Sequence, residues 1–273
     1  MLISKQVVGM KQKRIYFIVL IVFIIGSLFF IGRRVKEGFD GPSDKALVIV
    51  EPRSHKDLAR VIKNFDDIMP NDWDLYVFHG KSNGAFAAEA TQGLSGRTVK
   101  LIPLETDNLN ADSYNKLFKQ ESFWNQINAE TIFVFQTDTA LCKNTITKLD
   151  EFLKYDYIGC SVDNKAVGVN TSPWWGTLPF YGVGGLSMRK KSFTLKCIKD
   201  RPVEDKYPED VFFSECVHNS PNKPESAEVL GRFCTQNTFF QPSFGAHKTT
   251  VLKKEHQEPF YRFCPESKFM KED

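Results

Sequence analysis

The sequence predicts an α/β fold in which helices flank a central, mostly parallel sheet. Three observations lead to this class. Short apolar runs of strand length alternate along residues 46–160 with segments of helical periodicity. The run 46–50 is continuously apolar, as expected for a parallel strand that is buried on both faces. Alternation of strands with helices is typical of parallel sheets joined by right-handed crossovers.

Five runs predict the first strands of this sheet. The run 46–50 is entirely aliphatic, and the run 131–135 combines β-branched and aromatic residues, which favour strands. The complete set is 46–50, 75–78, 99–102, 131–135 and 157–160. A later strand is predicted over 186–188, directly after a glycine-rich segment.

Helices are predicted between the strands. Ser54 begins the first, with Asp57 three residues later as its capping-box partner, and apolar residues follow at helical spacing as far as Met69. Pro208 suits the first turn of a late helix, because its fixed φ angle is compatible with that position. The other two are predicted from Asp112 or Ser113 to Trp124 and from Asn144 or Thr145 to Leu153.

The N-terminal region predicts a membrane anchor. Residues 15–31 form an uncharged apolar run, close to the roughly 20 residues that span a bilayer. Basic residues lie on both sides of the run, so charge alone does not fix its orientation. We expect a cytoplasmic tail over 1–14, a transmembrane helix over 15–32, a stem over 33–45 and a globular domain over 46–273. The alternative for the apolar run is a signal peptide.

Composition and motifs exclude several classes of protein. The net charge of +3 is too weak to indicate a nucleic-acid partner. Six cysteines without a CxxC pair argue against a cysteine zinc site, and their even number is compatible with disulfides in an oxidising compartment. The chain lacks the GxGxxG, GxxxxGK[ST] and GxSxG motifs of dinucleotide-binding, P-loop and α/β-hydrolase proteins.

The strand at 131–135 leads into the first candidate site. It runs into Gln136, Thr137, Asp138 and Thr139, and ligands of open α/β sheets bind at the carboxyl ends of strands. A carboxylate with a hydroxyl on each side suits a hard divalent cation and a phosphate ligand. The alternative is that Asp138 caps the helix that follows.

Aromatic and glycine residues mark the next candidates. Trp174 and Trp175 are adjacent, so both cannot point to one face of a regular element; one of them could stack on a sugar ring, or both could anchor a loop. Gly184 and Gly185 allow the backbone to approach a ligand closely. The alternative for the glycines is a β-bulge that ends in the solvated basic residues 189–191.

Acidic residues and a histidine complete the candidate set. Glu209 and Asp210 follow Pro208, where acids in the first turn of a helix interact favourably with its dipole. A carboxylate in that position could also act as a general base toward a hydroxyl group. His247 is a candidate metal ligand beside Asp138, because imidazole and carboxylate together suit manganese; the alternative is a packed or exposed histidine.

Taken in order, four segments resemble the motifs of GT-A-fold glycosyltransferases. They are QTDT at a strand end, GVGGLSMR, PEDVFF and FGAHK, and the resemblance covers roughly residues 46–250. The set is most similar to a family of glycosyltransferase-like domains of unknown function. The PEDV segment is also similar to that of inverting β-1,3-galactosyltransferase-like enzymes. The resemblance implies a GT-A-like catalytic domain over 46–273.

The resemblance implies a nucleotide-sugar donor, with a UDP-sugar expected, and Mn²⁺ or Mg²⁺ as the cofactor. Asp138 maps onto the last acid of the family's DxD motif and would bind the cation together with His247. Gln136 stands where the first acid is usual, which is a departure that brings no charge to the metal. Gln136, Thr137 and Asp138 would bind the donor, and Gly184 and Gly185 would line the floor beneath it.

The resemblance also implies how the acceptor reacts. Asp210 would be the base, with Glu209 as the alternative, and Trp174 and Trp175 would bind the acceptor, a hydroxyl of a glycan, protein or lipid. The displacement would invert the anomeric centre. A short tail, one span and a stem are the plan of secretory-pathway glycosyltransferases, so we expect a single-pass type II membrane protein that faces the Golgi or ER lumen.

Two other functions remain open from the sequence. One is a non-catalytic sugar- or nucleotide-binding protein on a decayed transferase fold, which Gln136 favours. The other is a nucleotidyltransferase, although the loop after the first strand, 51–54, contains a single basic residue. Sugar transfer releases a nucleoside diphosphate, whereas nucleotidyl transfer releases pyrophosphate.

Overall fold

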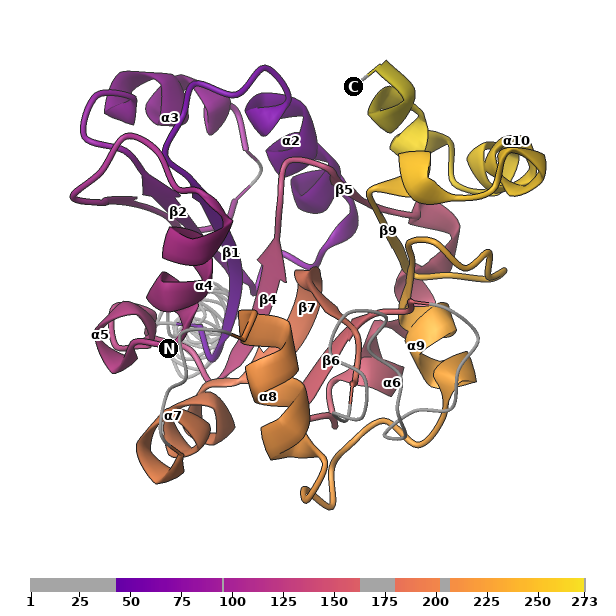
Figure 1. Ribbon diagram of the computed structural model, residues 1–273. Coiled ribbons are helices and arrows are strands. Elements are labelled where there is room, and N and C mark those ends of the chain that lie inside the picture. The colour runs from indigo at the N-terminus through magenta and orange to yellow at the C-terminus, as the bar shows by residue number, and fades with distance from the viewer. Residues whose placement is uncertain (1–42, 95, 163–179, 202–206, 273) are drawn as a thin grey trace, which may run out of the picture. The chain divides into compact units, whose positions relative to one another are not determined.

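The computed structural model describes residues 43–94, 96–162, 180–201 and 207–272 (Figure 1). They belong to a compact unit that spans Pro42–Asp273. The predicted tail, transmembrane helix and most of the stem lie outside the described residues. Within the part of the chain that is described, no helix is both long and apolar enough to cross a membrane.

A six-stranded sheet in the order β3-β2-β1-β4-β7-β6 forms the centre of this unit. The strands β3, β2, β1 and β4 pair in parallel, and β7 runs antiparallel to β4 and β6. The mixed α/β architecture with a mostly parallel sheet is therefore as predicted. The strands are β1 (Lys45–Glu51), β2 (Asp74–His79), β3 (Val99–Pro103), β4 (Thr131–Phe135), β6 (Tyr157–Cys160) and β7 (Val183–Lys190).

Each face of the sheet packs against its own set of helices. Leu47 and Ile49 of β1 belong to one apolar cluster, and Ala46, Val48 and Val50 belong to the other, because successive side chains of a strand point to opposite faces. The first cluster includes residues of α2 (Leu58–Ile68), α3 (Gly84–Ala90), α6 (Leu149–Phe152), α9 (Ala227–Phe233) and α10 (Lys254–Phe263).

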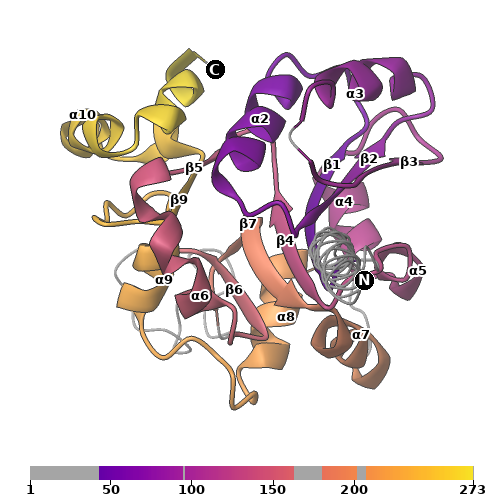
Figure 2. The ribbon, with the colours of Figure 1, turned by 180° about the vertical axis from the view of Figure 1, so that it is seen from behind.

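The second cluster includes residues of the remaining α-helices. These are α4 (Ala111–Phe118), α5 (Glu121–Trp124), α7 (Lys191–Asp200) and α8 (Glu209–Val217). Helix α8 lies in front of the sheet in Figure 1 and behind it in the opposite view of Figure 2. Burial of both faces explains why the central runs 46–50 of β1 and 132–135 of β4 are continuously apolar.

A second, three-stranded sheet in the order β5-β9-β8 extends from the end of β4. Its strands are β5 (Thr139–Leu141), β8 (Cys234–Thr235) and β9 (Gly245–His247), and Thr139 pairs with His247. This pairing brings His247 next to the segment that follows β4. Three 3₁₀ helices complete the described part of the fold: η1 (Lys143–Lys148), η2 (Thr249–Val251) and η3 (Pro265–Glu272).

The predicted capping box at Ser54 is wrong. Helix α2 begins at Leu58, and its N-cap, Asp57, makes no side-chain capping bond. The Asp57 carboxylate is buried and instead contacts Lys56 and Arg60 at 3.4 and 3.5 Å. Ion pairs with neighbours in the sequence therefore take the place of the capping bond that the sequence pattern indicated.

The predicted helix from 112 or 113 to Trp124 is two helices, α4 and α5. The N-cap of α4 is Asn110, whose Oδ1 accepts a hydrogen bond of 2.9 Å from the Ser113 amide. The indole Nε1 of Trp124 donates to the carbonyl of Phe118 at 2.7 Å, so a side chain takes an acceptor that a continuing helix would use. The predicted helix from 144 or 145 to 153 is likewise a 3₁₀ turn, η1, followed by the short α6.

All six cysteines form disulfides, two of which join elements that are distant in sequence. The pairs are Cys142–Cys264, Cys160–Cys234 and Cys197–Cys216. The last pair links α7 to α8, and Cys160–Cys234 links the main sheet to the small sheet. The structure thus decides the question that the even cysteine count left open.

Candidate functional site

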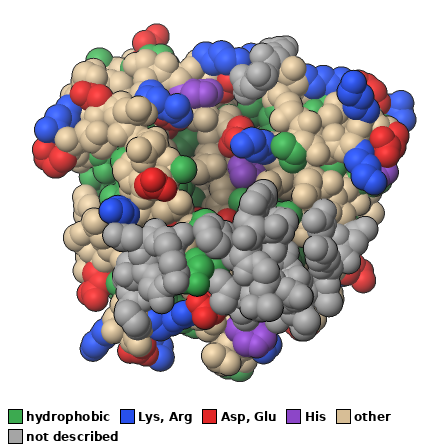
Figure 3. Space-filling view, viewed as in Figure 1, with side chains coloured by type: hydrophobic (Ala, Val, Ile, Leu, Met, Phe, Trp, Pro, Cys, Tyr) green, Lys and Arg blue, Asp and Glu red, His purple; other side chains and the backbone are tan. Residues whose placement is uncertain are grey.

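A cavity of about 630 Å³ opens at the carboxyl ends of β1 and β4. Strands β2 and β3 are added to one side of β1, and β4 is then added to the other side, so the strand order reverses at β1. Ligands of open α/β sheets bind at such a change of direction. The beginnings of β7, α4 and α8, together with β9, complete the wall. Figure 3 shows a hollow near the middle of this face, with acidic, basic and histidine side chains at its edge.

The cavity brings together eight of the predicted site residues, from segments more than 100 residues apart. They are Gln136, Thr137, Asp138, Gly184, Gly185, Glu209, Asp210 and His247. Trp174 and Trp175, the predicted acceptor residues, lie outside the described residues. The three C-terminal motifs thus converge on the end of β4.

Asp138 and His247 face each other in this cavity. Asp138 Oδ1 lies 3.4 Å from His247 Nε2 and has no hydrogen-bond partner among the described residues. His247 Nδ1 lies 2.9 Å from Oε1 of Gln236. Because an amide oxygen only accepts, Nδ1 carries a proton and Nε2 is the nitrogen turned toward Asp138. A proton or a cation between the two groups would satisfy both.

The surroundings of Asp138 keep its carboxylate ionised. Burial by itself raises the pKa of Asp138, but the interaction with His247 and the positive charge of Lys248 outweigh burial and hold the pKa below its ordinary value. The backbone fixes this arrangement as well, since the Lys248 amide donates to the Asp138 carbonyl at 2.9 Å.

Asp138 and His247 are the two side chains at this position that could hold a metal ion. Across the described ranges, no group of three or more histidine, cysteine, aspartate and glutamate residues could hold a metal ion. Mg²⁺ bound together with a phosphate commonly takes only one or two protein carboxylates and completes its shell with phosphate oxygens and water. One carboxylate and one imidazole therefore fit a cation that arrives with a phosphorylated ligand.

Asp210 has a very different environment. It lies in the first turn of α8, half-buried at the cavity wall, and its Oδ1 accepts a hydrogen bond of 2.8 Å from the Val211 amide. Burial raises the pKa of Asp210 to about 7, and the neighbouring Glu209 adds to this effect. The amides of Val211 and Gly184 and the charge of Arg189 act in the opposite direction. A carboxylate with such a pKa exchanges protons near neutral pH.

Glu209 is engaged by a buried cation. Its Oε2 lies 2.7 Å from Nη1 of Arg189, and the two side chains are 5% and 0% exposed. Gly184 leaves the space that this pair needs, because a Cβ there would lie 1.8 Å from Glu209 Oε1. The alternative interpretation of this segment placed Arg189 at a solvated basic strand end, whereas its side chain is inside the protein.

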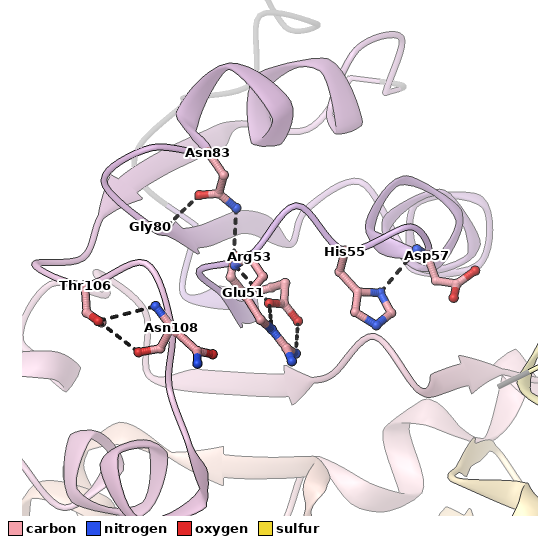
Figure 4. Close-up of polar contacts among 8 residues, drawn as sticks. All are labelled: Glu51, Arg53, His55, Asp57, Gly80, Asn83, Thr106 and Asn108. Carbon is pink, nitrogen blue, oxygen red and sulfur yellow. Dashed lines mark hydrogen bonds and ion pairs between the residues drawn. The ribbon is translucent and has the colours of Figure 1, made fainter.

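The sequence analysis did not identify the part of the cavity wall that is formed by the loop after β1. Arg53 binds the Glu51 carboxylate through Nε and Nη2 at 2.8 and 2.9 Å, and both residues line the cavity (Figure 4). Asn83 holds this loop in place by donating to the Glu51 carbonyl and accepting from the Gly80 amide. The position of Glu51 at a strand end was the available signal, since the same argument identified the segment after β4.

Helix α4 supplies a further part of the wall that was missed. Tyr114 and Asn115 line the cavity, and Asn115 Oδ1 accepts from the Glu209 amide at 3.1 Å. Burial raises the pKa of the Tyr114 phenol, so its hydroxyl stays protonated at physiological pH. Tyr114 lies within the helix predicted from 112 or 113 to Trp124, and its sequence context indicated a role in packing alone. It does pack there, stacked on Phe118 with ring centroids 4.5 Å apart.

Several solved structures of one protein are similar to this chain at low identity. Residues 1–349 of TarS from S. aureus are 12% identical, with a TM-score of 0.49, over 83% of this chain and 71% of that one. The same TarS segment in complex with UDP-GlcNAc is 15% identical, with a TM-score of 0.47, over 78% and 60% of the two chains. Its complex with UDP is 12% identical, with a TM-score of 0.43, over 64% and 54%.

Sequence comparison identifies the family. No curated protein has a detectable sequence match to the chain. A family model described as "Protein of unknown function (DUF5672)" matches residues 98–247, which include β4, β7, the start of α8 and His247. Because this match covers more than half of the chain, the protein belongs to the DUF5672 family.

Proposed function

We propose that the protein is a glycosyltransferase that moves a sugar from a nucleoside-diphosphate donor, expected to be a UDP-sugar, to a hydroxyl acceptor. One observation carries the proposal: a single cavity at the switch point of the sheet holds the facing pair Asp138 and His247 and the proton-exchanging carboxylate of Asp210. An ionised cation-binding carboxylate and a separate base are the two groups that such a transfer needs.

Asp210 is the proposed base. It stands at the cavity wall, and its pKa of about 7 lets it accept a proton from an acceptor hydroxyl at neutral pH. General-base catalysis of this kind contributes about 10²–10⁴-fold in rate. Direct attack by the activated hydroxyl on the sugar displaces the diphosphate in a single step, and such a step inverts the anomeric centre.

Asp138 and His247 are the proposed ligands of Mn²⁺ or Mg²⁺. The fit rests on the Asp138 oxygen that lacks a hydrogen-bond partner and on the orientation of His247 Nε2 toward it. When bound, the cation would act as a Lewis acid that neutralises charge on the donor diphosphate. Gln136, whose side chain adjoins His247 across Gly185, is available to hydrogen-bond the donor.

The disulfides support the proposed location. Three disulfides in one domain are typical of proteins that fold in an oxidising compartment. The lumen of the secretory pathway is such a compartment. A type II anchor over 15–32 would place the domain there.

Donor binding is tested first by thermal shift of the full chain with UDP-sugars, with and without Mn²⁺. A ligand that binds the native state stabilises it, by about 2.7 kcal/mol at a concentration of 100 Kd. We expect a Mn²⁺-dependent shift that Asp138→Ala removes. Asp150→Asn is the matched control, because Asp150 is an exposed carboxylate of α6 that does not line the cavity.

Turnover is tested by the release of UDP in the presence of candidate acceptors. Asp210→Asn should bind the donor and release no UDP. Donor binding by the wild type without turnover on any acceptor would favour the non-catalytic alternative. Release of pyrophosphate would identify a nucleotidyltransferase, and the absence of any donor binding by folded protein would refute the proposal.

A further inference from the structure

Arg189 is a cation enclosed by aromatic rings. Its guanidinium carbon lies 4.9–5.5 Å from the centroids of four rings contributed by α4, α5, β6 and α8. Its Nε donates to Ser187 Oγ at 3.1 Å, and its Nη1 pairs with Glu209. A buried cation is tolerated only when it is paired, so Glu209 is needed to keep Arg189 inside. The four rings belong to Phe118, Trp124, Tyr157 and Phe213.

Glu209 is held at both its backbone and its carboxylate. The amide donates to Asn115 of α4, and the carboxylate lies between Arg189 and the backbone of Gly184. The side chain is 5% exposed. A group fixed in this way has little freedom to turn toward a substrate hydroxyl, whereas Asp210, the next residue, is only half-buried and is free of such an ion pair in the described contacts.

We infer that the buried Arg189–Glu209 pair is a positioning device for Asp210, and that Glu209 is not itself the base. The pair anchors the first turn of α8 to β7 and so fixes where Asp210 enters the cavity. It also places one negative charge directly beside the Asp210 carboxylate. This inference rests on the proposed function, in which Asp210 accepts the proton.

Two charged groups near Asp210 have opposite effects on its proton affinity. Glu209, on the same helix, strengthens proton binding, and Arg189, from β7, weakens it. Tyr157 from β6 is a neutral neighbour, Tyr114 from α4 lies beside Glu209, and Asp138 and His247 share the cavity. Loss of the Glu209 charge alone would leave Asp210 facing an unneutralised cation.

The test is a ¹³C-NMR titration of aspartate-labelled full chain, with the Asp210 carboxyl signal assigned by its absence in Asp210→Asn. Glu209→Gln keeps the shape of the side chain and removes its charge. We expect the proton-binding constant of Asp210 to fall about tenfold or more in this variant. The acid limb of the pH profile of kcat/KM should move to lower pH with it, while UDP binding stays the same.

A second variant covers the case in which Glu209→Gln does not fold, because a lone buried cation is strongly destabilising. Arg189→Gln combined with Glu209→Gln removes both charges. Since Glu209 affects Asp210 more than Arg189 does, the proton affinity of the double variant should lie below that of the wild type and above that of Glu209→Gln.

The matched control is another buried pair. Arg97 Nε lies 2.6 Å from Asp66 Oδ1, with both side chains at most 1% exposed, and neither residue lines the cavity. Asp66→Asn should lower the melting temperature and leave the Asp210 titration unchanged. A purely structural role for Glu209 would give the same result as this control.

The outcomes separate the inference from the proposed function. If Asp210 titrates as in the wild type in both Glu209 variants, the inference is overturned. It is also overturned if Glu209→Gln abolishes transfer while Asp210→Asn does not. If the Asp210 titration shifts as expected but the wild type transfers no sugar, the effect of the Arg189–Glu209 pair on Asp210 is confirmed and the proposed function is refuted.

Discussion

Gly185→Ala is the sharpest test of the Asp138–His247 arrangement. A Cβ on Gly185 would lie 2.4 Å from both Cε1 and Nε2 of His247 and 2.7 Å from Oε1 of Gln136. Gly185 does not have a positive φ angle, so backbone strain is not the issue and the effect is steric. Ordinary contacts begin at 3.4 Å, so the imidazole must move by about 1 Å.

The structure gives His247 little room for that movement. The residue is 4% exposed, lies in the middle strand of the small sheet, and is held on its far side by the 2.9 Å contact with Gln236. Overpacking of this kind typically costs about 1–3 kcal/mol of stability. A displacement of 1 Å at a catalytic group can lower the rate by about 10²-fold.

The assay measures the part of the UDP-induced thermal shift that depends on Mn²⁺. The rate of sugar transfer is measured next. We expect Gly185→Ala to lose the Mn²⁺-dependent part and to retain a folded domain. Gly184→Ala is the matched variant, because its Cβ would meet Glu209 instead. Gly184→Ala should alter the pH profile of the transfer rate and leave the Mn²⁺-dependent thermal shift unchanged. If Gly185→Ala responds to Mn²⁺ like the wild type, the assigned role of His247 is wrong.

Three further predictions follow from the same contacts. The rate kcat/KM should rise with pH through about 7, because Asp210 must lose its proton to act as a base; a flat profile from pH 5 to 9 would contradict this. Asp210→Asn should raise the melting temperature above pH 7 and have less effect at pH 5, since a raised pKa in the folded state means that ionisation destabilises the fold; lower stability at pH 8 would contradict it. Replacing both Cys197 and Cys216 by serine removes a disulfide of sequence separation 19. It should reduce the free energy of unfolding, measured by urea denaturation, by about 3 kcal/mol. A loss below about 1 kcal/mol would show that packing alone holds α7 against α8.

The strands were predictable because their signal is local. A buried strand such as 131–135 is apolar along its whole length, and the structure places it at β4 with the same bounds. Helix ends were less predictable, because tertiary contacts decide them. At the break between α4 and α5, Gln120 is extended and the Trp124 indole donates to the Phe118 carbonyl. The pairing of six cysteines has 15 possibilities and no local signal.

Part of the site was predictable from motifs, and part was not. Asp138, Asp210 and His247 each stand in a short recognisable segment, and all three line the cavity. Arg189 is the last residue of the GVGGLSMR segment, but that motif does not predict that its side chain is buried. It precedes two lysines, so the sequence indicates a solvated strand end, yet one residue of the three is drawn inside by Glu209, which is 20 positions away.

The environments of Asp138 and Asp210 account for a division of labour between two carboxylates in one cavity. The interaction with His247 and the charge of Lys248 hold the pKa of Asp138 below its ordinary value, whereas burial and the adjacent charge of Glu209 raise the pKa of Asp210 to about 7. Two acids whose pKa values are pushed apart in this way usually have different chemical roles. The first group is suited to remain a charged ligand, and the second is suited to exchange a proton. Arg189 makes the difference possible, because without it the charge of Glu209 could not be kept buried beside Asp210.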